Sequence, residues 1–451
     1  MEIVVIGGNA AGLSAASAIR RIHHDWKIDV YEKDQYISFG SCGIPYYVSE
    51  TVENLNSLIT LTPEIVEKKR KIPVHLMNEV TDVDFNSKTL TILDKNTKSQ
   101  YYRSYKILII ATGAHATSSS ELNLEHERIF YVHNLSHAEK LRTFLKTPNH
   151  KIQPVAIIGA GYIGLEMLEA YKAQGINDIT IIGPRLVFRS QSQKYLLKEL
   201  KLHEIKVILG KRVSQLEGLS KDRIKIHLDD HSSLETDLLQ ISIGVSPATD
   251  IFKNKGLNMQ PNGAILTDEY MRTNVSDVYA AGDCIASYHQ ILKQHVYYPL
   301  APAANKQGRL AGSIIAGKEV NPYPGIVGTS IFKVLDLYCA RTGISLEQAV
   351  AMGFDAESIL IENNEIAHYM GTKKMSVFLV FDPKSHLLLG AEITSPTALG
   401  AKKIDTLATA LSAKMKIEDI QSLDLAYAPP FAPVWDPILV AANIASKKLA
   451  K

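Results

Sequence analysis

The sequence predicts an α/β fold with two Rossmann-like dinucleotide-binding units, and three observations carry that prediction. A β-branched run is followed by the glycine-rich turn 7-GGNAAG-12 and then by a helical pattern. The segment 154-PVAIIGAGYIGLEM-167 repeats this order of strand, turn and helix. The length of 451 residues exceeds what one hydrophobic core supports, so we expect two or three domains.

The composition excludes several classes of protein. Hydrophobic residues make up 46% and charged residues 21% of the chain, as in ordinary globular proteins. The formal net charge of +2 provides no general attraction to nucleic acid or membranes, and no apolar run reaches the length of a membrane span. The N-terminal run is too short for a signal peptide, and Cys42, Cys284 and Cys339 are too scattered for a disulfide framework. We therefore expect a cytoplasmic protein with no nucleic-acid or membrane partner.

The first glycine-rich turn indicates a dinucleotide site. Gly7 and Gly12 let the backbone turn sharply and let the helix approach the strand, so that a pyrophosphate can rest on the helix N-terminus. The next strand, 28-IDVYEKD-34, delivers Glu32, which follows Gly12 by 20 residues and suits an acid that binds a ribose hydroxyl. Asn9 departs from the fingerprint, which has a glycine there. An ordinary strand-helix loop is the alternative interpretation.

The second turn matches the fingerprint fully, but the strand after it does not. The three glycines of the turn are Gly159, Gly161 and Gly164. The strand within 178-DITIIGPRLVFR-189 ends without an acid, at Gly183, with Arg185 and Arg189 nearby. These arginines suit a 2′-phosphate or, equally, a solvated surface, so the choice between NADH and NADPH stays open at this point.

Three further segments fit the same plan. The run 107-ILIIATGA-114 predicts a buried strand that ends in a small-residue turn, and 239-LQISIGVSP-247 repeats that shape. The second nucleotide unit is therefore expected to be inserted between them. The segment 273-TNVSDVYAAGDC-284 predicts a strand that ends in Gly282 and Asp283. A carboxylate there can accept hydrogen bonds from a ribityl chain, whereas the alternative is an ordinary loop aspartate.

Four motifs follow one another along the chain: GGNAAG with Glu32, ATG at Ala111, Thr112 and Gly113, GAGYIG, and YAAGD ending at Asp283. In this order, and over essentially the whole chain, they resemble the motifs of the flavoprotein pyridine nucleotide-disulfide oxidoreductases. The resemblance implies that the first turn and Asp283 hold FAD. It also implies that the second unit binds NADH or NADPH, with Tyr162 near the flavin ring and Glu166 on the following helix.

The resemblance further implies a division into three domains. The FAD-binding domain would comprise residues 1–115 and 247–320, and the NAD(P)H-binding domain, residues 116–246, would be inserted in it. Residues 321–451 would form an α+β dimerisation domain. This domain would make a homodimer whose active sites use both subunits.

Cys42, within 38-SFGSCGIPYY-47, is the expected redox centre. Family members with a local dithiol carry two cysteines five positions apart, whereas the position five after Cys42 is Tyr47. Cys42 would therefore react by forming a mixed disulfide with a substrate thiol or by oxidation to sulfenic acid. This chemistry requires a thiolate, which a helix N-terminus or an adjacent cofactor favours. Cys284 and Cys339 are expected to be structural.

Single-cysteine members of the family form two groups that the motifs separate. NADH oxidases and peroxidases resemble GxxHAG at the first turn, where this chain has Ala10 in place of the histidine. Coenzyme A disulfide reductases resemble SFxxCxxPY around the cysteine, and the matching residues are Ser38, Phe39, Cys42, Pro45 and Tyr46. The segment 426-AYAPPFAP-433 resembles the one that the partner subunit of these reductases sends toward the cysteine. Tyr427 is thus the expected active-site tyrosine.

Three basic residues complete the expected substrate site. Arg21 and Arg70 match positions at which the reductases bind the phosphates of coenzyme A, and plain surface charge is the alternative. His368, within 368-HYMG-371, stands where that group has a tyrosine, and Ser41 stands where it often has asparagine. A lone histidine is more often structural than catalytic, but this one could bind the same thiolate.

These observations together predict a FAD-dependent enzyme. It would pass electrons from NAD(P)H through the flavin to Cys42, which would reduce coenzyme A disulfide or a related persulfide or polysulfide. One alternative is a water-forming NADH oxidase that uses oxygen and a sulfenic acid at Cys42. Another is a redox-responsive flavoprotein without turnover, and a third is a fusion with a rhodanese domain, for which the chain ends too soon. No metal site is expected.

Overall fold

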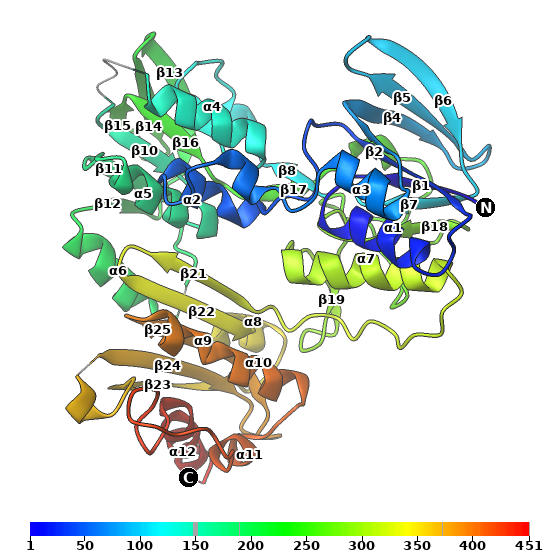
Figure 1. Cartoon of the computed structure of the whole chain (residues 1–451). Helices are drawn as coiled ribbons and strands as arrows, with labels where there is room; N and C mark the ends of the chain where they lie inside the picture. The colour runs from blue at the N-terminus through cyan, green and yellow to red at the C-terminus, as the bar shows by residue number, and fades with distance from the viewer. Residues whose placement is uncertain (148–151, 189, 372, 451) are drawn as a thin grey trace.

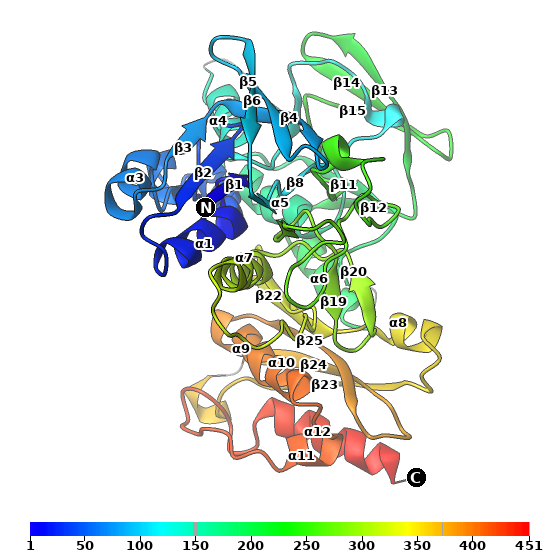
Figure 2. The same ribbon diagram turned by 90° about the vertical axis from the view of Figure 1, so that its right-hand side faces the viewer.

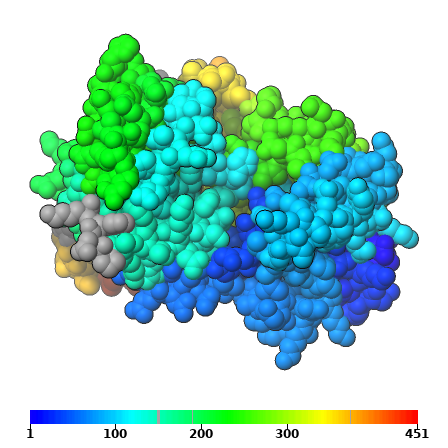
Figure 3. All heavy atoms as spheres, turned by 90° about the horizontal axis from the view of Figure 1, so that it is seen from above, coloured from blue at the N-terminus to red at the C-terminus, as the bar shows by residue number. Residues whose placement is uncertain are grey.

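The computed structural model describes residues 1–147, 152–188, 190–371 and 373–450. Two Rossmann-like units lie side by side above a third, C-terminal domain, as Figure 1 and the turned view in Figure 2 show. Seen from above in Figure 3, the blue N-terminal segments lie next to the cyan and green segments of the second unit. The predicted fold class is confirmed, whereas the predicted domain boundaries stay a prediction.

A five-stranded parallel sheet forms the centre of the first unit. Its strands in spatial order are β18 (Val278–Ala280), β7 (Ile107–Ile110), β1 (Glu2–Ile6), β2 (Lys27–Glu32) and β3 (Val74–Leu76). Because β18 pairs with β7, segments before and after the second unit share this sheet. An antiparallel sheet packs on it and consists of β4 (Asn78–Asp84), β5 (Thr89–Asp94) and β6 (Ser99–Ser104).

Two helices of the first unit, α1 (Ala10–Arg20) and α7 (Ala301–Ile315), pack at backbone contact. A Cβ at Gly308 of α7 would lie 2.1 Å from the carbonyl oxygen of Ala11 on α1. Gly312, one turn further on, meets α1 almost as closely. Only glycine permits such an approach, so this pair brings two segments from distant parts of the chain onto one surface.

The second unit repeats the design of the first. Its parallel sheet has the spatial order β12 (Lys206–Leu209), β11 (Ile179–Gly183), β10 (Val155–Ile158), β16 (Leu238–Ile241) and β9 (Ile129–Tyr131). Its helices are α4 (Leu135–Leu145), α5 (Tyr162–Ala173) and α6 (Gln193–Leu202). A small antiparallel sheet consists of β13 (Val213–Ser220), β14 (Arg223–Leu228) and β15 (Ser233–Thr236). The antiparallel pair β8 (Ala114–Ala116) and β17 (Val245–Pro247) carries the chain into and out of this unit.

The C-terminal domain is an antiparallel sheet with helices packed against both faces. The strands in spatial order are β21 (Ser330–Val334), β22 (Leu337–Gly343), β25 (Leu388–Ser395), β24 (Lys374–Phe381) and β23 (Glu357–Asn364). The helices are α8 (Leu346–Ala351), α9 (Ala398–Lys402), α10 (Ile404–Ser412), α11 (Ile417–Gln421) and α12 (Pro437–Leu449). One apolar cluster joins the inner strands to α10 and α12. No helix in the described part of the chain has the length and apolar character that crossing a bilayer requires.

The short helix α2 (Ile44–Val48) joins the three parts of the molecule. Its apolar side chains belong to one buried cluster that also contains residues of the second unit and of β21 and β22. The guanidinium of Arg142, on α4, lies 4.1 Å from the ring centroid of Tyr47. The same guanidinium donates a hydrogen bond of 2.9 Å to the carbonyl oxygen of Glu53. The loop that carries Cys42 is therefore held at the junction of the two units.

Candidate active site

The two glycine-rich turns adopt the same backbone geometry. Gly7 has a φ of +106° and Gly159 a φ of +112°, in the region that favours glycine. A Cβ at Gly7 would lie 2.1 Å from the carbonyl oxygen of Ala111, and a Cβ at Gly159 would lie 2.1 Å from that of Ser242. The last glycine of each turn would place a Cβ 1.9 Å from the carbonyl oxygen of the first. Each turn therefore packs against its neighbouring strand and helix with no room for a side chain.

Asn9 links the first turn to the loop that leads to Cys42. Its Oδ1 accepts a hydrogen bond of 3.2 Å from the amide of Phe39. The neighbouring Ser38 has a φ of +48°, and its amide donates to the carbonyl oxygen of Gly8 at 3.1 Å. The residue that departs from the fingerprint thus anchors the loop that carries Cys42, a role that the motif alone did not indicate.

Glu32 ends β2 and turns its carboxylate back onto the first turn. Oε2 accepts from the amide of Gly8 at 2.8 Å, and Oε1 accepts from the amide of Asp34 at 3.1 Å. Burial raises the pKa of Glu32, and these two hydrogen bonds oppose the rise. The strand β11 of the second unit ends in Gly183, and Arg185 is exposed two residues later. Residue 189 lies outside the described part of the chain.

Cys42 lies in the 3-10 turn Ser41–Gly43, which leads directly into α2. Its side chain is exposed, while the chain's other two cysteines are buried. Protein atoms remove part of the solvent around the sulfur, which raises the pKa of Cys42, and the carboxyls of Glu166 and Asp283 raise it further. The expected stabilisation of a thiolate is therefore not supplied by the charges of the described chain. The helix that follows has only five residues.

Two carboxyls near Cys42 are held largely away from water. Burial raises the pKa of Glu166 to about 7, with a smaller contribution from Glu169, and burial raises the pKa of Asp283 to about 6. Close to Asp283, the buried hydroxyl of Tyr297 has no hydrogen-bond partner among the described residues. Buried polar groups of this kind normally have a partner. The site therefore fits a polar ligand at this place, as a bound flavin would be.

The remaining residues predicted to bind nucleotides are divided between the two units. Ala111, Thr112 and Gly113 follow β7 directly. The amide of Gly282 donates to the side-chain oxygen of Gln307 at 3.0 Å. In the second unit the hydroxyl of Tyr162 lies 2.7 Å from that of Ser330, and burial raises the pKa of Tyr162 to about 12. A Cβ built at Gly161 would have no described atom within 4 Å, and this open space fits the approach of a nucleotide.

A polar cavity of about 390 Å³ begins at the first turn and runs along α1 and α7. Three residues predicted to bind substrate line it, namely Ser38, Arg21 and Arg70, the last of which ends α3 (Pro63–Arg70). The guanidinium of Arg70 donates to the hydroxyl of Ser17. Three further lining residues come from α7 and are Asn305, Lys306 and Arg309. The sequence analysis missed them because only the glycine contact between α1 and α7 brings them to this cavity.

The predicted tyrosine belongs to a different part of the chain from Cys42. Tyr427 is 48% exposed and lies between α11 and α12, which Figure 1 shows at the foot of the molecule, whereas α2 lies in the upper half. It forms a hydrogen bond with Tyr369, which raises the pKa of Tyr369. The rings of His368 and Tyr369 meet edge to face at a centroid distance of 5.3 Å. The amide of Ala367 donates to the carbonyl oxygen of Pro429 at 3.1 Å, so the two tyrosine segments are tied together.

Tyr369 is a candidate that sequence reasoning missed. The motif comparison concentrated on His368, whereas the structure pairs the next residue with Tyr427. The signal was present in 368-HYMG-371, in which Tyr369 directly follows His368. Phe39 lies on the Cys42 loop and packs against the apolar cluster around α2, and its role in binding substrate stays a prediction.

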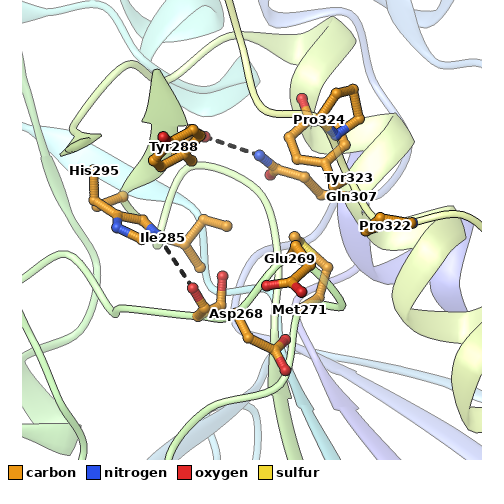
Figure 4. A pocket seen from close by; sticks show the side chains of 13 residues that line it. Asp268, Glu269, Met271, Ile285, Tyr288, His295, Gln307, Pro322, Tyr323 and Pro324 are labelled. Carbon is orange, nitrogen blue, oxygen red and sulfur yellow. Dashed lines mark hydrogen bonds between the residues drawn. The ribbon is translucent and has the colours of Figure 1, made fainter. Parts of the chain in front are cut away.

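A second cavity, of about 290 Å³, lies beside the hairpin of β19 (Ser287–His289) and β20 (Gln294–Val296), as Figure 4 shows. Met271, Ile285 and Pro322 contribute to its wall. Gln307 contributes as well, and its amide nitrogen donates to the hydroxyl of Ser287 at 2.9 Å. No residue predicted to bind substrate lines this cavity.

Glu199, His203 and Asp336 bring possible metal-ligand atoms within 4.8 Å of one another. Hydrogen bonds within the group account for this closeness. The Nε2 of His203 lies 3.1 Å from a carboxylate oxygen of Asp336, and the carboxylate of Glu199 accepts from the amide of Asp336 at 2.7 Å. The group therefore ties α6 to the turn between β21 and β22.

Comparison with known proteins identifies the family. A family model described as pyridine nucleotide-disulphide oxidoreductase matches residues 1–308, and the dimerisation domain of that family matches residues 329–437. The chain is 35% identical over 448 residues to an NAD(P)H coenzyme A polysulfide/persulfide reductase of Pyrococcus horikoshii, with 98% of each chain covered. It is 27% identical to a coenzyme A disulfide reductase of Staphylococcus haemolyticus, with 96% of each chain covered.

A solved structure matches over the whole length. The water-forming NADH oxidase of Lactobacillus brevis, bound to NADH, has a TM-score of 0.94 and 30% identity, and the match covers 100% of this chain and 99% of that one. The predicted family, the fold class and the pair of cofactors, a flavin and a nicotinamide nucleotide, agree with these matches. The chain belongs to the pyridine nucleotide-disulphide oxidoreductase family.

Proposed function

We propose that the chain is an NAD(P)H-dependent flavoenzyme that reduces coenzyme A disulfide, or a related persulfide or polysulfide, at Cys42. The observation that carries this proposal is the cavity beside the Cys42 loop. It starts at Asn9 and Ser38 and contains four cationic side chains, which are Arg21, Arg70, Lys306 and Arg309. Such a charge pattern suits the phosphates of coenzyme A, because one guanidinium group can donate two hydrogen bonds to two oxygens of the same phosphate.

The first unit would hold FAD, and the second would hold the nicotinamide nucleotide. Glu32 would face the ribose and Asp283 the ribityl chain, while Tyr162 and Glu166 would border the nicotinamide. When bound, the flavin accepts a hydride from the nicotinamide and supplies the electron pair that returns Cys42 to the thiolate. The chain's own contribution is to hold these groups in line and to exclude water from the carboxyls of Glu166 and Asp283.

The thiol step would be an exchange of disulfide bonds. The Cys42 thiolate attacks one sulfur of the substrate, the substrate S–S bond breaks, and a new S–S bond forms to Cys42 Sγ. The departing thiolate takes up a proton, for which the hydroxyl of Tyr427 from the partner subunit is the proposed donor. A proton on Glu166, whose pKa is about 7, removes a negative charge near Cys42 and so favours the attacking thiolate.

A homodimer would bring the tyrosine pair to the thiol. Cys42 precedes α2 in the upper half of Figure 1 and Tyr427 lies between α11 and α12 at its foot, so a second subunit would supply the contact. The tyrosine segments carry large apolar side chains that are at least half exposed, namely Phe431 at 58%, Val434 at 69%, Trp435 at 61% and Tyr369 at 63%. Exposed apolar groups gathered on one segment favour a subunit interface there.

The second candidate function is that of a water-forming NADH oxidase. An exposed thiol without a nearby second cysteine is the observation that favours it, since such a thiol can be oxidised to sulfenic acid. The cationic cavity counts against it, because oxygen needs no phosphate-binding groups.

The experiment compares the two reactions in one preparation. Purified flavin-containing protein is mixed with NADPH or NADH, first without oxygen in the presence of coenzyme A disulfide, then in air without the disulfide. We expect release of coenzyme A, and we expect Cys42→Ser to abolish it while flavin reduction continues. Cys339→Ala, at a buried cysteine, should keep the disulfide activity.

A second arm tests the cavity. Arg309→Ala should raise the KM for coenzyme A disulfide by about 10-fold, the loss expected for one charged hydrogen bond, and leave the KM for cystine unchanged. Rapid oxygen consumption without peroxide, together with no release of coenzyme A, would establish the oxidase instead. If Arg309→Ala raised the KM for coenzyme A disulfide and for cystine equally, the cavity would not be the binding site of coenzyme A.

A further inference from the structure

We propose that the second unit selects NADPH over NADH through two positions at the end of β11, the bare backbone of Gly183 and the guanidinium of Arg185. The inference rests on the proposed function only in taking the nicotinamide nucleotide as the electron donor. The names of the similar proteins leave the choice open for this chain, because they include an NAD(P)H enzyme, an NADH oxidase and an engineered NADPH oxidase.

The first step is to establish which residues of the two units occupy the same place. In the first sheet Ile6 pairs with Tyr31, and in the second Ile158 pairs with Ile182. The first glycine of each turn donates its amide to the second strand of its own sheet. Gly7 donates to the carbonyl oxygen of Tyr31 at 2.8 Å, and Gly159 donates to the carbonyl oxygen of Ile182 at 2.7 Å. The residue after each of these acceptors is therefore equivalent, so Gly183 stands where the first unit has Glu32.

The direction of the missing side chain confirms the equivalence. Glu32 places its carboxylate 2.8 Å from the amide of Gly8. A Cβ at Gly183 would lie 3.4 Å from the amide nitrogen of Ala160, the residue that corresponds to Gly8. A side chain at position 183 would thus point at the second turn as Glu32 points at the first. A carboxylate at this place binds a ribose 2′-hydroxyl and repels a 2′-phosphate.

The charge around the strand end is reversed between the units. Two residues after Glu32 the first unit has Asp34, whereas two residues after Gly183 the second has Arg185. The chain holds no acidic residue from Ile179 to Lys198. A guanidinium without an acidic residue in its own segment suits a phosphate dianion, which it can bind with two hydrogen bonds.

The backbone around Arg185 is held in place by its neighbours. Leu186 and Phe188 are buried at 2% and 0% exposure, and the amide of Val187 donates to the carbonyl oxygen of Ala160 at 3.1 Å. Pro184 and Arg185 therefore remain at the surface directly beside the second turn. The guanidinium can reach a group at the ribose edge without a change in the fold.

The test measures nucleotide binding apart from turnover. Titration calorimetry on the flavin-containing protein compares 2′,5′-ADP, which carries the 2′-phosphate of NADPH, with 5′-AMP, which lacks it. We expect 2′,5′-ADP to bind more tightly. Arg185→Ala should weaken 2′,5′-ADP by about 10-fold to 100-fold, the range for hydrogen bonds to a charged group, and leave 5′-AMP unchanged.

Two more variants complete the design. Gly183→Glu should reverse the order of the two ligands, and it should fold, because Gly183 is absent from the positive-φ glycines and its nearest Cβ contact is an ordinary 3.4 Å. Lys201→Gln removes the same charge from the exposed C-terminal end of α6 and should change nothing. The ratio of kcat/KM for NADPH over NADH should follow the binding order.

The outcomes separate this inference from the proposed function. Equal binding of both ligands to the wild type, or an Arg185→Ala variant with unchanged 2′,5′-ADP affinity, would overturn the selectivity. Tight 2′,5′-ADP binding in a protein that reduces no disulfide would contradict only the proposed function.

Discussion

The two glycine-rich turns share a backbone and differ in what they carry. Their first and last glycines are required in both, because a Cβ would lie 2.1 Å or less from a carbonyl oxygen. The middle position is free of that constraint. In the first turn it is Asn9, which accepts from the amide of Phe39, and in the second it is Gly161, with open space around it. The fingerprint thus requires glycine at the first and last positions, where backbones touch, and tolerates another residue at the middle position.

The difference also separates the tasks of the two units. The first unit holds the Cys42 loop through Asn9, whereas the second places Glu166 on α5, where its charge acts on the Cys42 thiol. Neither unit alone therefore defines the environment of the sulfur. The comparison can be tested by substituting first the glycines that both turns share and then the residues that differ between the two units.

The largest effect is expected at the shared glycines. Gly12→Ala and Gly164→Ala each force a methyl group to within 1.9 Å of a backbone oxygen, which should destabilise the affected unit by more than about 3 kcal/mol. Flavin content and denaturant unfolding measure the outcome. Gly12→Ala should lose flavin, whereas Gly164→Ala should retain it and lose nucleotide binding.

The control for this pair is Gly161→Ala, which has space for a methyl group among the described residues and should stay within about 0.5 kcal/mol of the wild type. If Gly12→Ala bound flavin normally and unfolded like the wild type, the close approach would not be a constraint of the turn.

An intermediate effect is expected at Glu166. Its carboxylate raises the pKa of Cys42, so Glu166→Gln should increase the thiolate fraction and the rate of alkylation by iodoacetamide, by roughly twofold to fivefold. The pKa of Glu166 is about 7, so the carboxyl is neutral below that pH and charged above it. The gain should therefore appear above about pH 7 and vanish at pH 5.

Glu169→Gln provides the matched control on the same helix well above pH 7, where Glu166 is charged in both proteins, since Glu169 acts on Cys42 only through the pKa of Glu166. The measurement is the alkylation rate of Cys42 as a function of pH, followed by mass spectrometry. A gain that is equally large at pH 5 would mean that packing, and not the charge of Glu166, causes it.

The smallest effect is expected at Asn9. Asn9→Gly restores the glycine of the fingerprint but removes the acceptor of the Phe39 amide, which should cost about 0.5 to 1.5 kcal/mol. Hydrogen exchange at Phe39 should speed up while flavin stays bound. Asn9→Asp keeps an acceptor and should restore slow exchange, and unchanged exchange in Asn9→Gly would show that the loop does not depend on this bond.

Local patterns were sufficient for the elements that hold the nucleotides. The order of strand, glycine turn and helix predicted both turns, and the acid at the end of the second strand predicted Glu32, because these features depend on residues close in sequence. The resemblance to the coenzyme A disulfide reductases, and not a local pattern, predicted that Arg21, Arg70 and Ser38 belong to the substrate site, and the structure places all three on one cavity. Their role in binding stays a prediction.

The sequence by itself determined the fold class, the family motifs and the lone thiol at Cys42, since each follows from residue types at short spacing. Tertiary structure alone decided that Lys306 and Arg309 join the cavity, that Tyr369 pairs with Tyr427, and that neighbouring carboxyls raise the pKa of Cys42. The physical reason is that these features depend on contacts between segments far apart in the chain. Such contacts are set by packing, which a local pattern does not encode.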